Sequence, residues 1–215
     1  IKESDDQGGL DMWFNPSYRG NVIRYNYWHD IANDRACGQA GIRLDDAISG
    51  TVIYGNIFRK CSAGGFGAIQ IHGGKDNEVV NNIMIDCNNA VSFSQWPEET
   101  FKNFIKESAK EALHKTVEIS GPPNSTKYPA LAKLDQDINV NFIWNNIAVN
   151  CGDLFARDNG KEKTVSNIVL SDDPGFVDLS RHNFKLKQDS FILQSGAFRP
   201  IPFGEIGLYK DNYRR

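Results

Sequence analysis

The sequence predicts an all-β chain folded as a parallel β-helix, and three observations lead to that prediction. One short phrase recurs along the chain, alternating apolar and polar segments lie between its copies, and Gly, Asn and Asp mark the corners without a convincing helix between the strands. Helix-free units of roughly 20 to 30 residues cannot bury both sides of their strands alone. Stacking them coil on coil gives each unit a shared core.

The recurring phrase has an Asn as its second residue and a Cys or Ile as its last. Its copies are YNYWHDI (25–31), GNIFRKC (55–61), NNIMIDC (81–87) and NNIAVNC (145–151), with a weaker form, VSNIVL, at 165–170. The aligned residues are Asn26, Asn56, Asn82, Asn146 and Asn167, at intervals of 30, 26, 64 and 21 residues. We expect each Asn at a sharp corner, where Asn tolerates left-handed backbone and its amide can bond the same Asn in the neighbouring coils.

Three cysteines follow the same alignment. Cys61, Cys87 and Cys151 each lie five residues after the aligned Asn, so they should sit above one another in successive coils. Such stacked positions favour small buried hydrophobes, and we expect free thiols rather than disulfides. The cysteines therefore leave the redox compartment open.

The predicted strands come in pairs. An alternating segment, GIRLDD (41–46) or AIQIHGG (68–74), is followed by a second one, TVIYGNIF (51–58) or NEVVNNIMI (77–85). An insertion at about 95–135 interrupts this order. It is partly helical, and we interpret it as a lid or groove wall; its apolar positions at spacings of three and four are Phe101, Phe104, Ile105, Ala109, Ala112 and Leu113. The repeat ends near Asp172, so residues of about 172–215 should cap the core of a single domain spanning 1–215.

The composition describes an ordinary globular domain. Of 215 residues, 40% are hydrophobic and 24% are charged, with a net charge of −3. This balance favours neither nucleic acid nor an anionic membrane as a partner. The chain has no run of about 18 apolar residues that could span a bilayer, and its first residues, IKESDDQGG, do not resemble a secretory signal.

One strand face gathers most of the reactive side chains. Ile42 and Leu44 must face the core, so Arg43 and Asp45 face outward. The same alternation places Gln70 and His72 outside in AIQIHGG, and Asp11 and Trp13 outside in GGLDMWF. Stacking the coils gives two expected rows: Asp11, Arg43, Gln70 and Trp13, Asp45, His72.

These rows suggest a sugar-binding or catalytic groove. An indole stacks on a pyranose face, and the charged groups can bind hydroxyls or transfer protons; Asp46, Lys75 and Asp76 follow at the strand ends. A structural interpretation stands beside this one. Leu-Asp-Asp before a turn is common at corners, and Asp11 with Arg43 could be a plain ion pair between coils. No Cys/His spacing resembles a zinc site.

Several segments resemble a known family. RGNVIRYNYWHDI, IRLDDAISGTVIYGNIF, HGGKDNEVVNNIMIDC and the closing DPGFVD…NFKLKQDS…RPIPFGEIGLYKDNYR are similar to the C-terminal part of bacterial proteins related to glycoside hydrolase family 141. The resemblance covers essentially the whole chain. It implies a right-handed parallel β-helix, a solenoid like that of pectate lyases, in a secreted or periplasmic carbohydrate-active enzyme. It also implies further N-terminal coils that this sequence does not contain.

The resemblance also implies which residues act. The family's Leu-Asp-Asp matches Asp45 and Asp46, and an Asp before Gly-Gly matches Asp6, which makes these three the predicted catalytic residues. Asp6 should lie near the entry of its strand and Asp46 near the exit of its own, so we favour Asp45 and Asp46. The predicted substrate-binding residues are Asp11, Trp13, Arg43, Gln70, His72 and Lys75, without a resident metal.

Three functional hypotheses follow. In the first, a glycoside hydrolase acts on a plant-type polysaccharide, with one Asp of the pair Asp45/Asp46 opposite Asp11 or Asp6. In the second, a lyase uses Arg43 or Lys75 as base in β-elimination, and Asp45, Asp46 and Asp76 hold Ca²⁺. In the third, the β-helix is a non-catalytic sugar-binding or structural scaffold.

Overall fold

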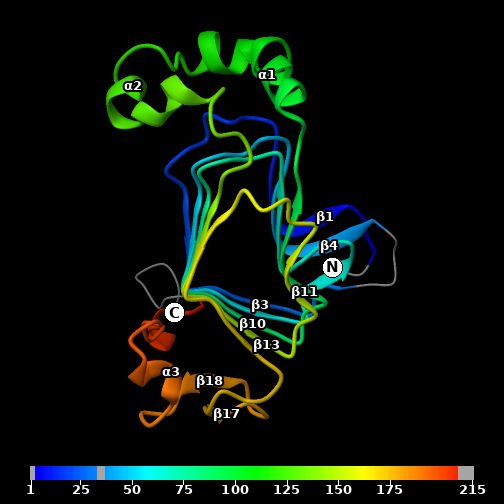
Figure 1. The fold of residues 1–215 in the computed structure, drawn as a ribbon, viewed down its shortest axis with the longest axis vertical. Helices are drawn as coiled ribbons and strands as arrows, with labels where there is room; N and C mark the ends of the chain where they lie inside the picture. Colours follow the sequence, from blue (N-terminus) through cyan, green and yellow to red (C-terminus); the bar gives the residue numbers. More distant parts are fainter. Residues whose placement is uncertain (1–2, 33–36, 208–215) are drawn as a thin grey trace, which may run out of the picture.

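The chain forms a stack of coils bounded by three parallel β-sheets. The computed structural model describes residues 3–32 and 37–207. In Figure 1 the successive coils overlie one another, with one sheet on each side of the cross-section. The prediction of a mostly β, solenoid-like fold with parallel sheets is therefore confirmed.

Each coil gives one strand to each sheet, and the three sheets are named here A, B and C. The strands of sheet A, in spatial order, are β1 (Gln7–Met12), β4 (Gly38–Leu44), β8 (Ile69–His72), β11 (Asn89–Ser94) and β14 (Asp153–Ala156), with β7 (Ser62–Gly64) antiparallel to β4. Those of sheet B are β2 (Val22–Arg24), β5 (Val52–Tyr54), β9 (Glu78–Val80), β12 (Phe142–Trp144) and β15 (Lys163–Val165). Those of sheet C are β3 (Tyr27–His29), β6 (Ile57–Arg59), β10 (Ile83–Ile85), β13 (Ile147–Val149) and β16 (Ile168–Leu170).

The second segment of each predicted pair is in fact two strands. TVIYGNIF contains β5 and β6, which a corner at Gly55 and Asn56 separates. The residue just before the aligned Asn adopts the left-handed conformation, with φ of 63° at Gly55, 57° at Asn81 and 56° at Asn145. The prediction that the aligned Asn itself is left-handed was thus wrong by one residue. Left-handed backbone favours Gly and Asn, which explains the Asn-Asn and Gly-Asn pairs of the repeat.

The aligned asparagines form a hydrogen-bonded ladder inside this corner. The Nδ2 group of Asn56 donates to Asn82 Oδ1 at 3.1 Å, and Asn82 Nδ2 donates to Asn146 Oδ1 at 3.0 Å. Asn26 and Asn167 extend the ladder at either end. The predicted stacking of side-chain amides is therefore confirmed, and it satisfies polar backbone groups in a corner closed to water.

The core lies between the three sheets. It contains Ile42 and Leu44 from sheet A, Ile53 and Val79 from sheet B and Phe58 from sheet C, all fully buried. The inward orientation predicted for the apolar positions of GIRLDD is confirmed. The cysteines on the ladder carry free thiols, with Cys61 and Cys87 buried, and desolvation raises the pKa of Cys61 to about 12.

The segment between β11 and β12 leaves the stack and returns to it. It contains α1 (Glu98–Lys106), a π-helical segment (Ala112–Thr116), α2 (Asn124–Lys127) and a 3-10 helix (Pro129–Lys133), at the upper end of the cross-section in Figure 1. Phe101 of α1 packs against Ala47, at the turn that follows β4. Among the described residues, no helix has the length and apolar character needed to cross a membrane.

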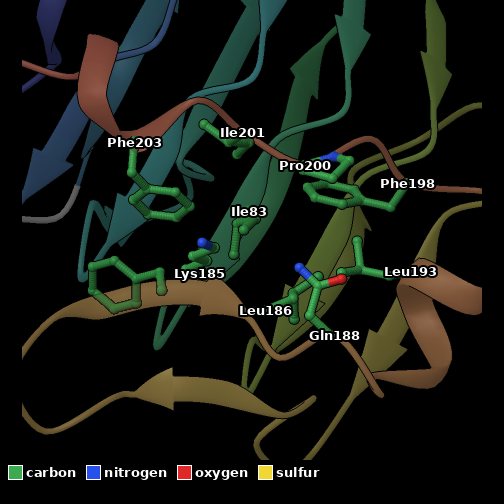
Figure 2. A pocket seen from close by; sticks show the side chains of 10 residues that line it. Ile83, Lys185, Leu186, Gln188, Leu193, Phe198, Pro200, Ile201 and Phe203 are labelled. Carbon is green, nitrogen blue, oxygen red and sulfur yellow. The ribbon is translucent and has the colours of Figure 1, made fainter.

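The C-terminal segment packs against the outer side of sheet C. It contains β17 (Phe176–Asp178) antiparallel to β18 (Asn183–Leu186), then α3 (Phe191–Gln194) and a 3-10 helix (Phe203–Glu205). Figure 2 shows Leu186, Leu193, Phe198 and Ile201 near Ile83 of β10. These side chains line a cavity of about 80 Å³. This small apolar space has no carboxylate or imidazole in its lining, which is typical of a packing gap. Residues 208–215 of the predicted cap lie outside the described residues.

Candidate functional site

The outer face of sheet A brings the predicted residues together through strand register. Asp11 of β1 pairs with Arg43 of β4, and Arg43 pairs with Gln70 of β8. Two residues further along the chain in each coil, Asp45 contacts His72. The rows expected from the sequence are therefore present, because the alternation of side chains continues across neighbouring coils.

Arg43 contacts three aspartates on this face. Its Nη2 lies 2.7 Å from Asp45 Oδ2 and 3.1 Å from Asp6 Oδ1, and its Nη1 lies 3.7 Å from Asp11 Oδ2. The Arg43 side chain is only 12% exposed, so these charges are screened less than those of a surface pair. One guanidinium thus holds three carboxylates from two neighbouring coils.

The tautomer of His72 can be deduced from its two hydrogen bonds. The indole Nε1 of Trp96 lies 2.7 Å from His72 Nε2, and an indole N–H can only donate. His72 Nε2 therefore accepts, and the ring proton sits on Nδ1, which donates to Asp45 Oδ1 at 2.7 Å. These two contacts select the tautomer with the proton on Nδ1, which fixes the orientation of the Asp45 carboxylate.

Two carboxyl groups around Arg43 are in different electrostatic states. Burial acts to raise the pKa of Asp45, but the hydrogen bond from His72 and the charge of Arg43 outweigh it, so this pKa is lowered. Burial also raises the pKa of Asp11, and here the opposing Gly8 N–H and Arg43 do not outweigh it. Asp45 is therefore kept ionised, while Asp11 retains a proton to higher pH. Such divergence is typical of an acid and its ionised partner.

Asp46 is the more accessible member of its pair. Its side chain is 27% exposed against 9% for Asp45, and its Oδ2 accepts a hydrogen bond of 2.6 Å from Trp13 Nε1. Asp46 and the following Ala47 both have left-handed backbone, with φ of 40° and 69°. Left-handed backbone at a buried Ala is strained, and such strain often marks functional turns.

Aromatic side chains border this group. Trp13 is 61% exposed and lies 5.2 Å from the ring of Phe14, which in turn contacts Phe104 of α1. Phe104 also packs edge-on against Trp96, with ring centroids 5.1 Å apart. The helical segment after β11 therefore supplies aromatic groups beside the carboxylates.

Three residues that the sequence analysis considered for the groove have side chains engaged by other parts of the protein. Gln70 is buried, and its amide bonds Ser92, Ser94 and Arg157 rather than open solvent. Lys75 is also buried, and its Nζ donates to the backbone carbonyls of Lys133 and Gln136, where it anchors the returning segment. Asp76 pairs with Arg19 at 2.7 Å. The Lys75 ammonium is therefore not available to a ligand that binds beside the aspartates around Arg43.

Asp45, Asp46 and His72 lie close enough to hold a metal ion. One ligand atom from each can be chosen so that all three lie within 4.8 Å of one another. However, His72 Nδ1 carries a proton directed at these carboxylates, because Trp96 donates to its other nitrogen. The proton occupies the lone pair that a metal would need, so the hydrogen bonding fits an ion-pair network better than a cation site.

A second carboxyl pair lies beyond the predicted rows. Burial and the neighbouring Asp158 raise the pKa of Glu162 to about 7, and the pKa of Asp158 is lowered by the hydrogen bond between the two groups. Glu162 Oε1 accepts a hydrogen bond from Gln95. Its other oxygen, Oε2, is buried and has no hydrogen-bond partner of its own among the described residues. Sequence reasoning did not identify this pair, because Glu162 lies in a polar loop that no repeat position marks.

The replacement Glu162→Gln should flatten the pH dependence of stability. With a raised pKa, the folded state binds more protons than the unfolded state between the ordinary value of 4.5 and about 7, so stability falls as pH rises through this window. The loss is on the order of 3 kcal/mol. A Gln amide mimics the protonated form, because it can donate to Asp158 and accept from Gln95.

Urea unfolding from pH 4 to pH 8 measures this effect. Glu99→Gln, which removes the same charge at an exposed position of α1, is the matched control and should keep the wild-type slope. If Glu162→Gln has the wild-type slope as well, the two carboxyl groups do not share a proton.

Trp96 and Phe104 are the other residues that the sequence reasoning did not assign to the site. Both belong to the segment interpreted as a groove wall, and their aromatic character next to a predicted sugar face is a signal that could have marked them. No family model, curated protein or solved structure shows a significant match to this chain. A function is therefore inferred from the arrangement of its side chains.

Proposed function

We propose that this chain belongs to a glycoside hydrolase built on a right-handed parallel β-helix and acts on a plant-type polysaccharide. The observation that carries the proposal is the raised pKa of Asp11, a half-buried carboxyl group beside Arg43, on the same face of sheet A as the carboxyl groups of Asp45 and Asp46. Glycoside hydrolysis needs one carboxyl group that is protonated and another that is ionised across the glycosidic bond. The resemblance to proteins related to glycoside hydrolase family 141 is in keeping with this chemistry and with a secreted or periplasmic enzyme.

In this proposal Asp11 is the general acid. Its raised pKa keeps a proton available, and the side chain is 29% exposed, so it can reach a substrate on sheet A. The proton passes to the glycosidic oxygen as the bond to the anomeric carbon breaks.

Asp46 is the second carboxyl group of the pair. Its Oδ2 is fixed by Trp13, and its Oδ1 has only a longer contact of 3.4 Å with His72 Nδ1, so Oδ1 can stabilise the developing positive charge, either by attack on the anomeric carbon or through a water molecule. Asp45 is less suited to this role, because Arg43 and His72 occupy its two oxygens. We therefore assign Asp45, Arg43 and His72 to positioning, with Trp96 fixing the imidazole. Asp6 is a further carboxylate bound to Arg43.

Hydrolysis is favoured over β-elimination by the state of the two candidate bases. Elimination requires a base that can approach a sugar C–H bond. Lys75 is buried against backbone carbonyls, and the Arg43 guanidinium is engaged by three carboxylates. Neither group is free to take a proton from a substrate.

The leaving group provides the test of Asp11. An unactivated oligosaccharide needs a proton at the departing oxygen, whereas a nitrophenyl glycoside does not. The variant Asp11→Asn should therefore lose about 10²–10⁴-fold in kcat/KM on oligosaccharides and much less on nitrophenyl glycosides of the same sugar. Release of reducing ends and of nitrophenol measures the two reactions. Equal losses on both substrates, or no loss on either, would contradict the acid role.

A further inference from the structure

A second hollow adjoins the proposed site at the end of β11. It is an open surface hollow of about 480 Å³, and its polar and aromatic lining comes from Ser94, Gln95, Trp96, Asn139, Arg157 and Lys161. Trp96 connects it to the proposed catalytic group, because the indole lines this cavity and also donates to His72. A chain of sugars that passes Trp13 and Asp46 can therefore continue towards this hollow.

Arg157 differs from Arg19, Arg43 and Arg59 in its charge environment. Arg19, Arg43 and Arg59 each form salt bridges to aspartates. Arg157 forms none with any carboxylate in residues 3–32 and 37–207. Partial burial lowers the pKa of Arg157, although the residue as a whole is exposed and so is open to a ligand from solvent.

The guanidinium of Arg157 is nevertheless held in a fixed place. Its Nη2 donates to Gln70 Oε1 at 2.9 Å, and its Cζ lies 5.7 Å from the centre of the Phe66 ring. The backbone at Arg157 is left-handed, with φ of 59°, which is uncommon for a bulky residue. A strained backbone and two contacts therefore present one uncompensated cation beside the cavity.

The other charged groups of this region leave that cation available. Lys161 adds a second positive charge to the lining. Glu98 also lines the cavity, but its carboxylate lies 2.6 Å from Lys102 Nζ. Asp158 and Glu162, on the same loop as Arg157, share a hydrogen bond with each other. The lining thus carries an excess of positive charge next to an indole.

We propose that this cavity is a subsite for an acidic sugar, with Arg157 binding the carboxylate of a hexuronate unit and Trp96 contacting the sugar ring. A guanidinium fork matches a carboxylate with two parallel hydrogen bonds, and an indole stacks on a pyranose face. The inference rests on the proposed function in taking the occupant as part of a polysaccharide. It specifies that function by naming the class of polymer: one that contains uronic acid.

Matched ligands test the subsite. Binding of a galacturonate trisaccharide and of a galactose trisaccharide with the same linkage is measured by calorimetry, so that the two probes differ only in the carboxylates. The protein carries Asp46→Asn, which prevents turnover during the measurement. We expect the acidic trisaccharide to bind about 10- to 100-fold more tightly, and Arg157→Gln to remove that preference.

Two further variants separate the fork from simple charge. Arg157→Lys keeps the charge but loses the two parallel donors, so it should retain only part of the preference. Arg181→Gln removes one positive charge at an exposed position and should leave the preference intact. Circular dichroism and thermal unfolding establish that each variant is folded.

Binding without a preference for the acidic trisaccharide, no binding of either probe, or a preference that survives Arg157→Gln would overturn the subsite. Turnover is not part of this readout. A preference that depends on Arg157 in a chain without hydrolytic activity would support the subsite and count against the proposed hydrolase. Hydrolysis of neutral substrates by a chain that shows no preference for the acidic trisaccharide would support the proposed hydrolase and count against the subsite.

Discussion

The variant Asp46→Asn is expected to lose about 10²–10⁴-fold in kcat/KM on any glycoside that the chain hydrolyses. An amide cannot attack the anomeric carbon or take a proton from water. It can still accept the hydrogen bond from Trp13 Nε1, and Asn tolerates the left-handed backbone of this turn. The loss should therefore appear in activity and not in stability.

Asp30→Asn is the matched control for that loss. Asp30 is an exposed aspartate with left-handed backbone, φ 53°, at the end of β3 in sheet C. Its replacement removes the same charge from the same kind of turn and should leave turnover unchanged. Wild-type turnover by Asp46→Asn, with a thermal unfolding temperature equal to that of the wild type, would remove Asp46 from the mechanism.

The variant Asn82→Ala should cause the largest loss of stability, on the order of 4 kcal/mol. Asn82 is completely buried and takes part in the ladder on both sides. Its Oδ1 accepts from the backbone and side-chain nitrogens of Asn56, and its Nδ2 donates to Asn146 Oδ1 and to the Ile53 carbonyl. Truncation leaves the Asn56 N–H and the Ile53 carbonyl buried without partners, which is more costly than the loss of an exposed bond.

Asn26→Ala, at the end of the same ladder, provides the comparison. Its Nδ2 also donates to the next Asn and to a backbone carbonyl, but this end of the ladder is only partly buried. Water can replace the lost groups there, so we expect a loss of about 1 kcal/mol. Urea unfolding of the two variants measures the difference. Similar small losses at both positions would show that the ladder does not stabilise the coils.

The repeat made much of the fold predictable. A period-two pattern with Ile42 and Leu44 inside determines that Arg43 faces outward, and the aligned asparagines determine which coils are neighbours. The third strand of each coil was missed because the corner between β5 and β6 has a single left-handed residue, Gly55, within an apolar run. Nothing in the alternation itself marks such a corner.

The candidate site was predictable only where the repeat supplied the register. Asp11, Arg43 and Gln70 could be aligned because their strands follow regular turns. Arg157 and Glu162 were not assigned, because Arg157 lies just beyond the end of β14 and Glu162 lies in the polar loop before β15, where no apolar alternation indicates the direction of a side chain. The burial of Lys75 has a similar origin: the carbonyls that bind it, at Lys133 and Gln136, belong to that segment and are distant in sequence.

The measurement that tests the hydrolase most directly is a product assay on plant-derived oligosaccharides, including acidic ones, and on aryl glycosides. Reducing ends and ultraviolet absorbance are followed in the same reaction. We predict reducing ends without new absorbance, because hydrolysis adds water and leaves no double bond, and we predict that Asp46→Asn abolishes them. An increase in absorbance with the cleavage would indicate β-elimination, and the absence of any product across the panel would indicate a binding scaffold; either result would contradict the proposed function.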